Sequence, residues 1–224
     1  MTPRVVALIP MRHTSERVPG KNYRKLGDRP LYRHIVDTLL GCSLISEVVV
    51  DTDSPVIVEG LSKDLPEVGL IERPQHLRAP DVPMNEVLLH DVSLLKADFY
   101  LQTHSTNPLL RADTIERAIE SFLESLAQHD SLFSVSALRT RLWDECGRPL
   151  NHDPSVLLRT QDLPPVYAEN SNLYLFSAET LRLRRNRIGE RPLLFTIDRI
   201  EAWDIDDELD FQIAELLWAK LRAA

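Results

Sequence analysis

The sequence has few cysteines and no long apolar run. Its two cysteines, Cys42 and Cys146, lack any CxxC or Cys/His ligand spacing, which argues against a structural zinc site. No apolar stretch approaches the roughly 20 residues that a membrane helix needs. Residues 1–4 lead directly into a strand-like segment and leave no room for a signal peptide. We therefore expect a cytoplasmic protein without membrane contact.

Positive charge is also in short supply. Lysine and arginine total 26 against 34 aspartates and glutamates, so the formal net charge is −8. A protein with this balance lacks the general electrostatic surface that holds nucleic acid. Most of the excess negative charge is explained by a solvated acidic surface. Any anionic ligand must therefore be bound by a local cluster of cations, and we expect no nucleic-acid partner.

What the chain does have is a regular alternation of strand-like and helical segments. Short β-branched runs alternate with amphipathic patterns over about the first 138 residues. This alternation predicts a mostly parallel sheet with helices on both faces and ligands at the carboxyl ends of its strands. We expect strands at 5–9, 47–51, 69–72, 97–102 and 131–138, and helices at 30–40, 84–96 and 113–126.

The alternation stops at residues 139–169, a proline-containing polar stretch without a convincing helix or strand. A loop of this length in a small domain is functional or disordered. We predict a single domain, 1–224, in which 139–169 is an inserted arm that closes a ligand site or contacts a partner subunit. After the arm we expect strands at 171–176, 195–197 and 202–205, and a closing helix at 207–221.

The loop after the first strand carries the first candidate site. It offers the cations Arg12 and Lys21, the hydroxyl of Ser15, and Gly20, which lets backbone N–H groups approach an anion. A triphosphate needs this mixture, because arginine binds its oxygens as a fork and lysine acts as a point charge. These residues alone are equally compatible with an ordinary charged surface loop.

Five segments, in order, carry a resemblance to one enzyme family. The loop fits the pattern I-P-A-R-x-x-S-K-x-x-P-x-K-N at Ile9, Pro10, Arg12, Ser15, Pro19, Lys21 and Asn22. The others are Val49–Asp53 (V-S-T-D), Leu101–Arg111 (L-Q-P-T-S-P-L-R), Arg159–Tyr167 with Asn170 and Tyr174 (R-x-Q-D-L-P…N-G-x-x-Y), and Asp204–Asp206 (I-D-I-D). Together they resemble the acylneuraminate cytidylyltransferases, or CMP-sialic acid synthetases, over nearly the whole chain.

The resemblance implies a fold, a reaction and a set of site residues. It implies a three-layer αβα sandwich with a mixed, mostly parallel sheet, a Rossmann-like nucleotidyltransferase fold, and a homodimer formed through the arm. It also implies a CTP-dependent transferase that joins CMP to an acidic 2-keto sugar and releases pyrophosphate. Arg12, Ser15, Lys21, Asn22, Arg73 and Asp81 would bind the nucleotide, and Gln102, Arg159 and Tyr174 the sugar. Arg12, Lys21 and Asp206 would carry the catalysis.

Asp204 and Asp206 would hold Mg²⁺, or Mn²⁺, in that family. On a strand, residues two apart point to one face, and magnesium favours one or two carboxylates together with phosphate oxygens. The alternative is that these acids favour the N-terminus of the following helix.

Several departures mark the chain as a divergent member. Glu16 replaces a lysine, a loss that Arg17 could offset, Asp81–Met84 replaces D-T-A-S, and Ser171 replaces a glycine. Rival interpretations are a Kdo, legionaminate or pseudaminate cytidylyltransferase and a non-catalytic nucleotide-binding relative. The paired aspartates disfavour Kdo, whose enzymes usually keep only the second acid. The histidines, including His104, are read as surface or hydrogen-bonded core residues. The basic run at 182–187 is read as solvated, with an intersubunit role open.

Overall fold

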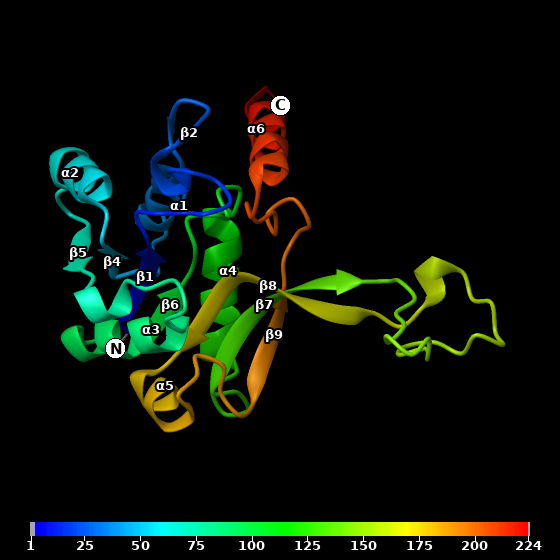
Figure 1. Cartoon of the computed structure of the whole chain (residues 1–224). Coiled ribbons are helices and arrows are strands. Elements are labelled where there is room, and N and C mark those ends of the chain that lie inside the picture. Colours follow the sequence, from blue (N-terminus) through cyan, green and yellow to red (C-terminus); the bar gives the residue numbers. More distant parts are fainter. Residues whose placement is uncertain (1–2, 224) are drawn as a thin grey trace.

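The apolar run near the N-terminus forms the central strand of the sheet, β1 (Val5–Met11), in which every residue is buried. It pairs in parallel with β4 (Glu47–Thr52) on one side and β6 (Phe99–Gln102) on the other. The computed structural model describes residues 3–223, and within them the main sheet has the order β5-β4-β1-β6-β8-β7-β9 (Figure 1). β5 (Gly69–Glu72) continues the parallel part.

The second half of the sheet is mixed. β8 (Val166–Phe176) runs antiparallel to both β6 and β7 (Ser131–Leu138), and β9 (Pro192–Thr196) pairs in parallel with β7. The prediction of a mixed, mostly parallel sheet is thus confirmed. The strands expected at 47–51, 69–72 and 131–138 lie within one residue of the observed bounds.

Five helices cover the two faces of the sheet (Figure 1). Alternate residues of β1 explain this, because Val5, Ala7 and Ile9 pack into one apolar cluster, and Val6 and Leu8 into another. The first cluster includes α1 (Leu31–Leu40), α2 (Pro55–Asp64) and α4 (Ala112–Glu124), and the second α3 (Met84–Leu94) and α5 (Ala178–Arg184). The three-layer architecture is therefore confirmed. No helix within residues 3–223 has the length and apolar character needed to cross a membrane.

The last helix, α6 (Glu208–Ala223), closes a smaller third cluster beside the first loop. Phe211 and Ala214 of α6 pack with Val18, Leu26 and Leu31. Leu26 belongs to the short antiparallel pair β2 (Lys25–Leu26) and β3 (Arg29–Pro30), which follows the 3₁₀ turn η1 (Lys21–Tyr23). This cluster brings the C-terminal segment against the cationic loop, far away in sequence.

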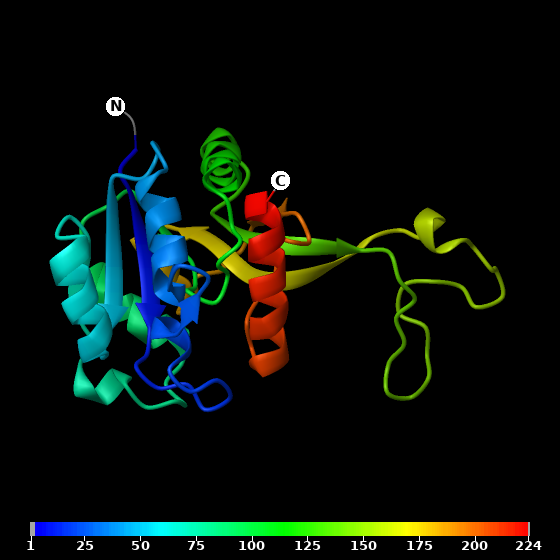
Figure 2. The same cartoon turned by 90° about the horizontal axis from the view of Figure 1, so that it is seen from above.

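The arm projects away from the body of the molecule (Figure 2). Our prediction of a stretch without secondary structure over 139–169 was wrong at its end, because β8 begins at Val166 and a 3₁₀ turn, η3, spans Thr160–Asp162. The reason is that β7 and β8 pair out to Leu138 and Val166, so a two-stranded ribbon carries the arm.

A further expectation was also wrong, because residues 202–205 form no strand. Among residues 3–223, Ile205 makes one backbone–backbone hydrogen bond to the body, from its N–H to the carbonyl of Thr106 at 3.0 Å. The helix expected at 113–126 spans Ala112–Glu124, and its N-cap is Arg111. The Asp113 carboxylate pairs with the Arg111 guanidinium at 3.0 Å.

Candidate functional site

A cleft of about 540 Å³ opens at the carboxyl ends of β1, β5 and β6. Its lining combines the loop after β1 with segments that follow β5 and β6. Cations, hydroxyls and a buried amide therefore meet at the edge where open α/β sheets bind ligands. The lining residues used below are Arg12, Ser15, Arg17, Lys21, Asn22, Arg73, Met84, His104 and Ser105.

The loop after β1 is tied down by its own polar residues. The Asn22 side chain donates to the backbone carbonyl of Arg12 at 2.7 Å and accepts from the Ser105 hydroxyl at 2.7 Å. Gly20 has φ 68°, a left-handed conformation that few other residues adopt without cost. Asn22 is thus a structural brace within the cleft. Among the described residues the guanidinium of Arg12 makes no ion pair, so it is available to a ligand.

Lys21 brings the loop together with the two C-terminal aspartates. Its ammonium group donates to the carbonyl of Ile205 at 2.6 Å, between Asp204 and Asp206. Burial lowers the pKa of Lys21, and the charges of Asp204 and Asp206 oppose that shift. Arg17 forms an ion pair with Asp206 at 2.7 Å. Residues nearly two hundred positions apart therefore meet at Lys21 and Arg17, which line the cleft, whereas the two aspartates lie beside it.

Asp204 is the buried member of the acid pair. Burial raises its pKa, and the charge of Asp206 adds to the shift, while a hydrogen bond from Thr106 opposes it. Its Oδ1 atom is buried and finds no hydrogen-bond partner among the described residues. A buried carboxylate oxygen without a partner is costly. The donor set and this free oxygen fit a hard divalent cation such as Mg²⁺.

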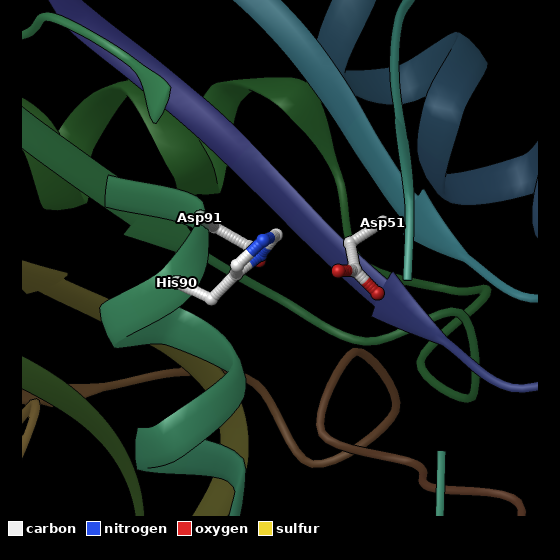
Figure 3. Close-up of side chains that lie close together, drawn as sticks. All are labelled: Asp51, His90 and Asp91. Atoms are coloured by element: carbon white, nitrogen blue, oxygen red, sulfur yellow. The ribbon is translucent and has the colours of Figure 1, made fainter. Parts of the chain in front are cut away.

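Arg73 lines the cleft and is supported by a buried acidic group. It follows β5, is 2% exposed, and forms an ion pair with the 1% exposed Asp51 at the end of β4. His90 and Asp91 of α3 lie close to Asp51 (Figure 3). Burial, and then the charge of Asp51, raises the pKa of Asp91 to about 9, so this carboxyl is protonated at neutral pH. The proton on Asp91 leaves that carboxyl without charge, and the Arg73 guanidinium offsets the charge of Asp51. The ion pair with Asp51 therefore holds Arg73 in place.

Asp81 and the two predicted sugar residues of the sheet lie elsewhere. Asp81 is exposed and does not line the cleft, whereas its neighbour Pro80 does. Gln102 and Tyr174 are both fully buried at 0% exposure, behind the cleft surface. Their polar atoms contact other side chains of the same chain, so any effect on a substrate passes through those neighbours.

Those neighbours include two residues that the sequence reasoning set aside. The Arg187 guanidinium stacks on the Tyr174 ring at 3.5 Å and donates to the Gln102 side-chain oxygen. The Gln102 amide nitrogen lies 2.9 Å from Nε2 of His104, which lines the cleft. Arg187 was hidden within a basic run whose other arginines, at 182, 184 and 185, are exposed. No periodicity in the sequence separates it from them.

Arg159 lies outside the cleft of its own chain. It begins the 3₁₀ turn of the arm, its side chain is 74% exposed, and it pairs with Asp162 at 2.7 Å. The views agree in placing the arm away from the body (Figures 1 and 2). Within one chain, the structure therefore brings Lys21 together with Asp204 and Asp206 beside a cleft that Arg12 also lines, and it leaves Arg159 apart.

Ser171, a departure from the family pattern, has a left-handed backbone with φ 57°. A glycine adopts this conformation without the cost that a Cβ atom adds. The serine hydroxyl accepts a hydrogen bond from the Tyr174 hydroxyl at 3.2 Å. The backbone shape that a glycine would favour is thus kept, and a polar contact to Tyr174 is added.

Comparison with known proteins identifies a family and several relatives that this chain resembles. A family model described as "Cytidylyltransferase" matches residues 6–222. "Post-translational flagellin modification protein B" of Campylobacter coli is 28% identical over 224 residues, covering 95% of this chain and 94% of that protein. "CMP-N,N'-diacetyllegionaminic acid synthase" of Legionella pneumophila is 28% identical over 244 residues, covering 96% of each.

A solved structure shows the same fold. It is titled as CMP:2-keto-3-deoxy-manno-octonic acid synthetase complexed with CTP, and it superposes with a TM-score of 0.71. At 17% identity it covers 97% of this chain and 99% of its own, a likeness that concerns the fold alone. The family match extends over almost the entire chain and includes every cleft residue named above. The chain therefore belongs to the cytidylyltransferase family.

Proposed function

We propose that this chain transfers CMP from CTP to the anomeric hydroxyl of an acidic nine-carbon 2-keto sugar. The observation that carries the proposal is the meeting of Lys21 with Asp204 and Asp206, at the side of a cleft that Lys21, Arg12 and Arg73 line. Relatives named for N-acylneuraminate, legionaminate and pseudaminate cytidylyl transfer support this sugar class. The Kdo-type alternative is supported by a relative that is 25% identical over 190 residues.

The reaction is an in-line displacement at the α-phosphorus of CTP. A bond forms between the anomeric oxygen and this phosphorus, the bond to the β-phosphate oxygen breaks, and the hydroxyl proton is lost to solvent. Arg12 and Lys21 would bind the phosphates and stabilise the charge that grows on the departing pyrophosphate. Ser15 and Asn22 would keep the loop in its binding shape, and Arg73 would face the nucleotide.

Asp204 and Asp206 are the residues that would hold Mg²⁺. The metal would offset phosphate charge and favour ionisation of the bound hydroxyl. The free buried oxygen of Asp204 supports this assignment, as does the pKa of Asp204, which burial and then Asp206 raise. Arg17 would have to share Asp206 with the metal, because it already pairs with that carboxylate.

The arm fits a homodimer in which each chain completes its partner's sugar site. Leu150, Val156 and Leu157 of the arm are 63%, 52% and 89% exposed, an apolar surface that one chain leaves uncovered. Exposed apolar patches of this kind mark interaction surfaces. Arg159 lies in the same segment and would then bind the sugar carboxylate across the interface.

One assay tests the proposal. Pyrophosphate release is measured with CTP, Mg²⁺ and a panel of acidic 2-keto sugars: N-acetylneuraminate, legionaminate, pseudaminate and Kdo. We expect release with CTP and at least one nonulosonate, and none without sugar or when EDTA is added. Release with Kdo alone would assign the chain to the alternative sugar class. Binding of CTP without release for any sugar would indicate a non-catalytic nucleotide-binding protein.

A further inference from the structure

Three side chains form a continuous hydrogen-bonded path from the protein interior to the cleft. Arg187 donates to the side-chain oxygen of Gln102, and the Gln102 amide nitrogen lies 2.9 Å from Nε2 of His104. The same nitrogen donates to the backbone carbonyl of Thr103 at 3.1 Å. His104 is the member of this path that lines the cleft. The path is therefore a link between a buried charge and the ligand site.

The first link determines the orientation of the Gln102 amide. A guanidinium carries only donors, so the atom of Gln102 that faces Arg187 must be the oxygen. Arg187 is itself held in place, because it stacks on Tyr174 at 3.5 Å and its backbone N–H donates to Asn85 at 3.2 Å. The opposite orientation would set two donors against each other, so the amide cannot turn over.

The second link then determines the tautomer of His104. The amide nitrogen of Gln102 can only donate, so Nε2 of His104 must accept. A neutral imidazole with one accepting nitrogen carries its proton on the other, here Nδ1. Among the described residues Nδ1 of His104 has no hydrogen-bond partner. The free N–H of this ring is therefore available to a ligand.

The surroundings of His104 keep the ring neutral. Burial, and then the positive charges of Arg187 and Lys21, lower its pKa to about 3. Lys21 belongs to the loop expected to bind phosphate, and Arg187 contacts Gln102 and Tyr174, which are buried behind the cleft surface. The imidazole is thus the part of this buried network that reaches the cleft, where an acidic ligand would meet a donor without a net charge.

We propose that Arg187, acting through Gln102, holds His104 as the Nδ1–H tautomer, and that His104 donates this hydrogen bond to an oxygen of the acidic sugar. The inference rests on the proposed function for the identity of the ligand. It makes His104 a specificity residue and Arg187 and Gln102 positioning residues. It also removes His104 as a general base, because one ring nitrogen is occupied by Gln102 and the other bears the proton.

The tautomer can be measured without any substrate. Long-range ¹H–¹⁵N correlation spectra of protein labelled with ¹⁵N-histidine distinguish the two tautomers, and a His104→Asn sample assigns the signal. We expect the Nδ1–H pattern, unchanged from pH 5.5 to 8. Arg187→Met, which keeps the bulk over Tyr174, should release the amide and give mixed tautomers. Arg184→Met, a change at an exposed arginine of the same run, should leave the pattern as it is.

Gln102→Glu provides the opposite test. A carboxylate accepts from Nε2–H, so this variant should reverse the tautomer and move the titration of His104 toward neutral pH. If Gln102→Glu or Arg187→Met does not fold, as judged by circular dichroism, the spectrum of the unaltered protein still distinguishes the two tautomers of His104. An Nε2–H pattern there, or titration of His104 near pH 6.5, would overturn the inference.

Activity separates this inference from the proposed function. His104→Ala should raise KM for the sugar about 10-fold, the usual effect of losing one such hydrogen bond, and leave KM for CTP unchanged. The unaltered enzyme should show no histidine-dependent limb in its pH profile, and Gln102→Glu should introduce one. If the enzyme is active and His104→Ala leaves KM for the sugar unchanged, the donor role of His104 is refuted, but the proposed function is not. An inactive enzyme with the Nδ1–H pattern would refute the proposed function and leave the tautomer assignment in place.

Discussion

The body of the molecule and its arm deal with polar and apolar groups in opposite ways. In the body, buried charges are paired within the chain, as Arg73 is with Asp51, and apolar residues of β1 are fully covered. In the arm, Leu157 is 89% exposed and Trp143 is 50% exposed, and the ion pairs join near neighbours in sequence, such as Arg159 with Asp162. Within one chain, the apolar residues of the sheet are covered, whereas those of the arm are left exposed.

This contrast separates the two substrates of the proposed reaction. Apart from Asp81, the residues expected to bind CTP line one cleft in the body of a single chain. One group expected to bind the sugar, Arg159, lies in the arm, where one chain provides nothing for it to act on. We therefore expect changes in the body to affect catalysis as a whole, and changes in the arm to affect only the sugar and only in an assembled dimer.

The largest effect is expected in the body, at the acid pair. Asp206→Ala should fold normally and lower kcat for pyrophosphate release by about 100- to 1,000-fold, because the metal that would offset phosphate charge loses one of its two carboxylate ligands. The rate is measured at saturating CTP and sugar over a range of Mg²⁺ concentrations. The Mg²⁺ concentration for half-maximal rate should rise together with the loss of rate.

Arg17→Met is the matched control for this variant. It removes the exposed ion pair with Asp206 and leaves both carboxylates in place. Its Mg²⁺ requirement should stay close to that of the unaltered protein. If the two variants behave alike, or if Asp206→Ala turns over at a near-normal rate, Asp206 serves the ion pair and not the metal.

A smaller and more selective effect is expected in the arm. Arg159→Ala should raise KM for the sugar by about 10-fold or more, as expected when a charge-assisted hydrogen bond is lost, and leave KM for CTP unchanged. Arg148→Ala provides the control, because this arginine of the arm is 77% exposed and also pairs with a nearby aspartate, Asp144. Equal effects on both substrates would remove Arg159 from the sugar site.

Mixing the Asp206→Ala and Arg159→Ala variants tests whether the arm acts across a dimer. A dimer of one Asp206→Ala chain and one Arg159→Ala chain contains one site with both native residues if the arm serves its partner. Refolding the variants together should then recover sugar turnover above that of either alone. No recovery, in a sample shown to be dimeric by light scattering, would mean that each arm serves its own chain or none.

The smallest effect is expected on the stability of the body, through the buried carboxyl of Asp91, and it does not involve the arm. The pKa of Asp91 is raised from 3.8 to about 9 by burial and by Asp51, with Arg73 opposing the shift and His90 adjacent. The folded protein thus binds more protons than the unfolded chain between these values, so the free energy of unfolding falls as pH rises. One proton sets the upper limit of the slope at about 1.4 kcal/mol per pH unit.

Asp91→Asn should remove this contribution, because an amide stays neutral and can donate to Asp51 as the protonated acid does. Urea unfolding between pH 6 and pH 9 measures it, and the variant should lose less stability over that range than the unaltered protein. An equal loss in the variant and the unaltered protein would show that Asp91 is ionised in the folded state and that Arg73 neutralises both acids.

The extent to which the site was predictable differs from residue to residue. The loop with Arg12, Ser15 and Lys21 and the pair Asp204 and Asp206 stand in contiguous motifs, so the sequence was enough to select them. His104 lies inside the Leu101–Arg111 motif segment but at a position that the sequence reasoning set aside, and Arg187 stands in no motif, so only packing between distant segments brings Arg187 to Gln102. The acid pair was selected from its motif, whereas the strand expected at 202–205 does not form.

The sequence by itself determined the layered α/β fold, because apolar periodicity within each segment encodes which face is buried. It also determined the family, because motif residues keep their order along the chain. Only the tertiary structure decided which charges meet, which arginine of the basic run is held against Tyr174, and where Arg159 lies. These depend on contacts between distant segments, whose energies arise from burial and pairing and leave no local pattern in the chain.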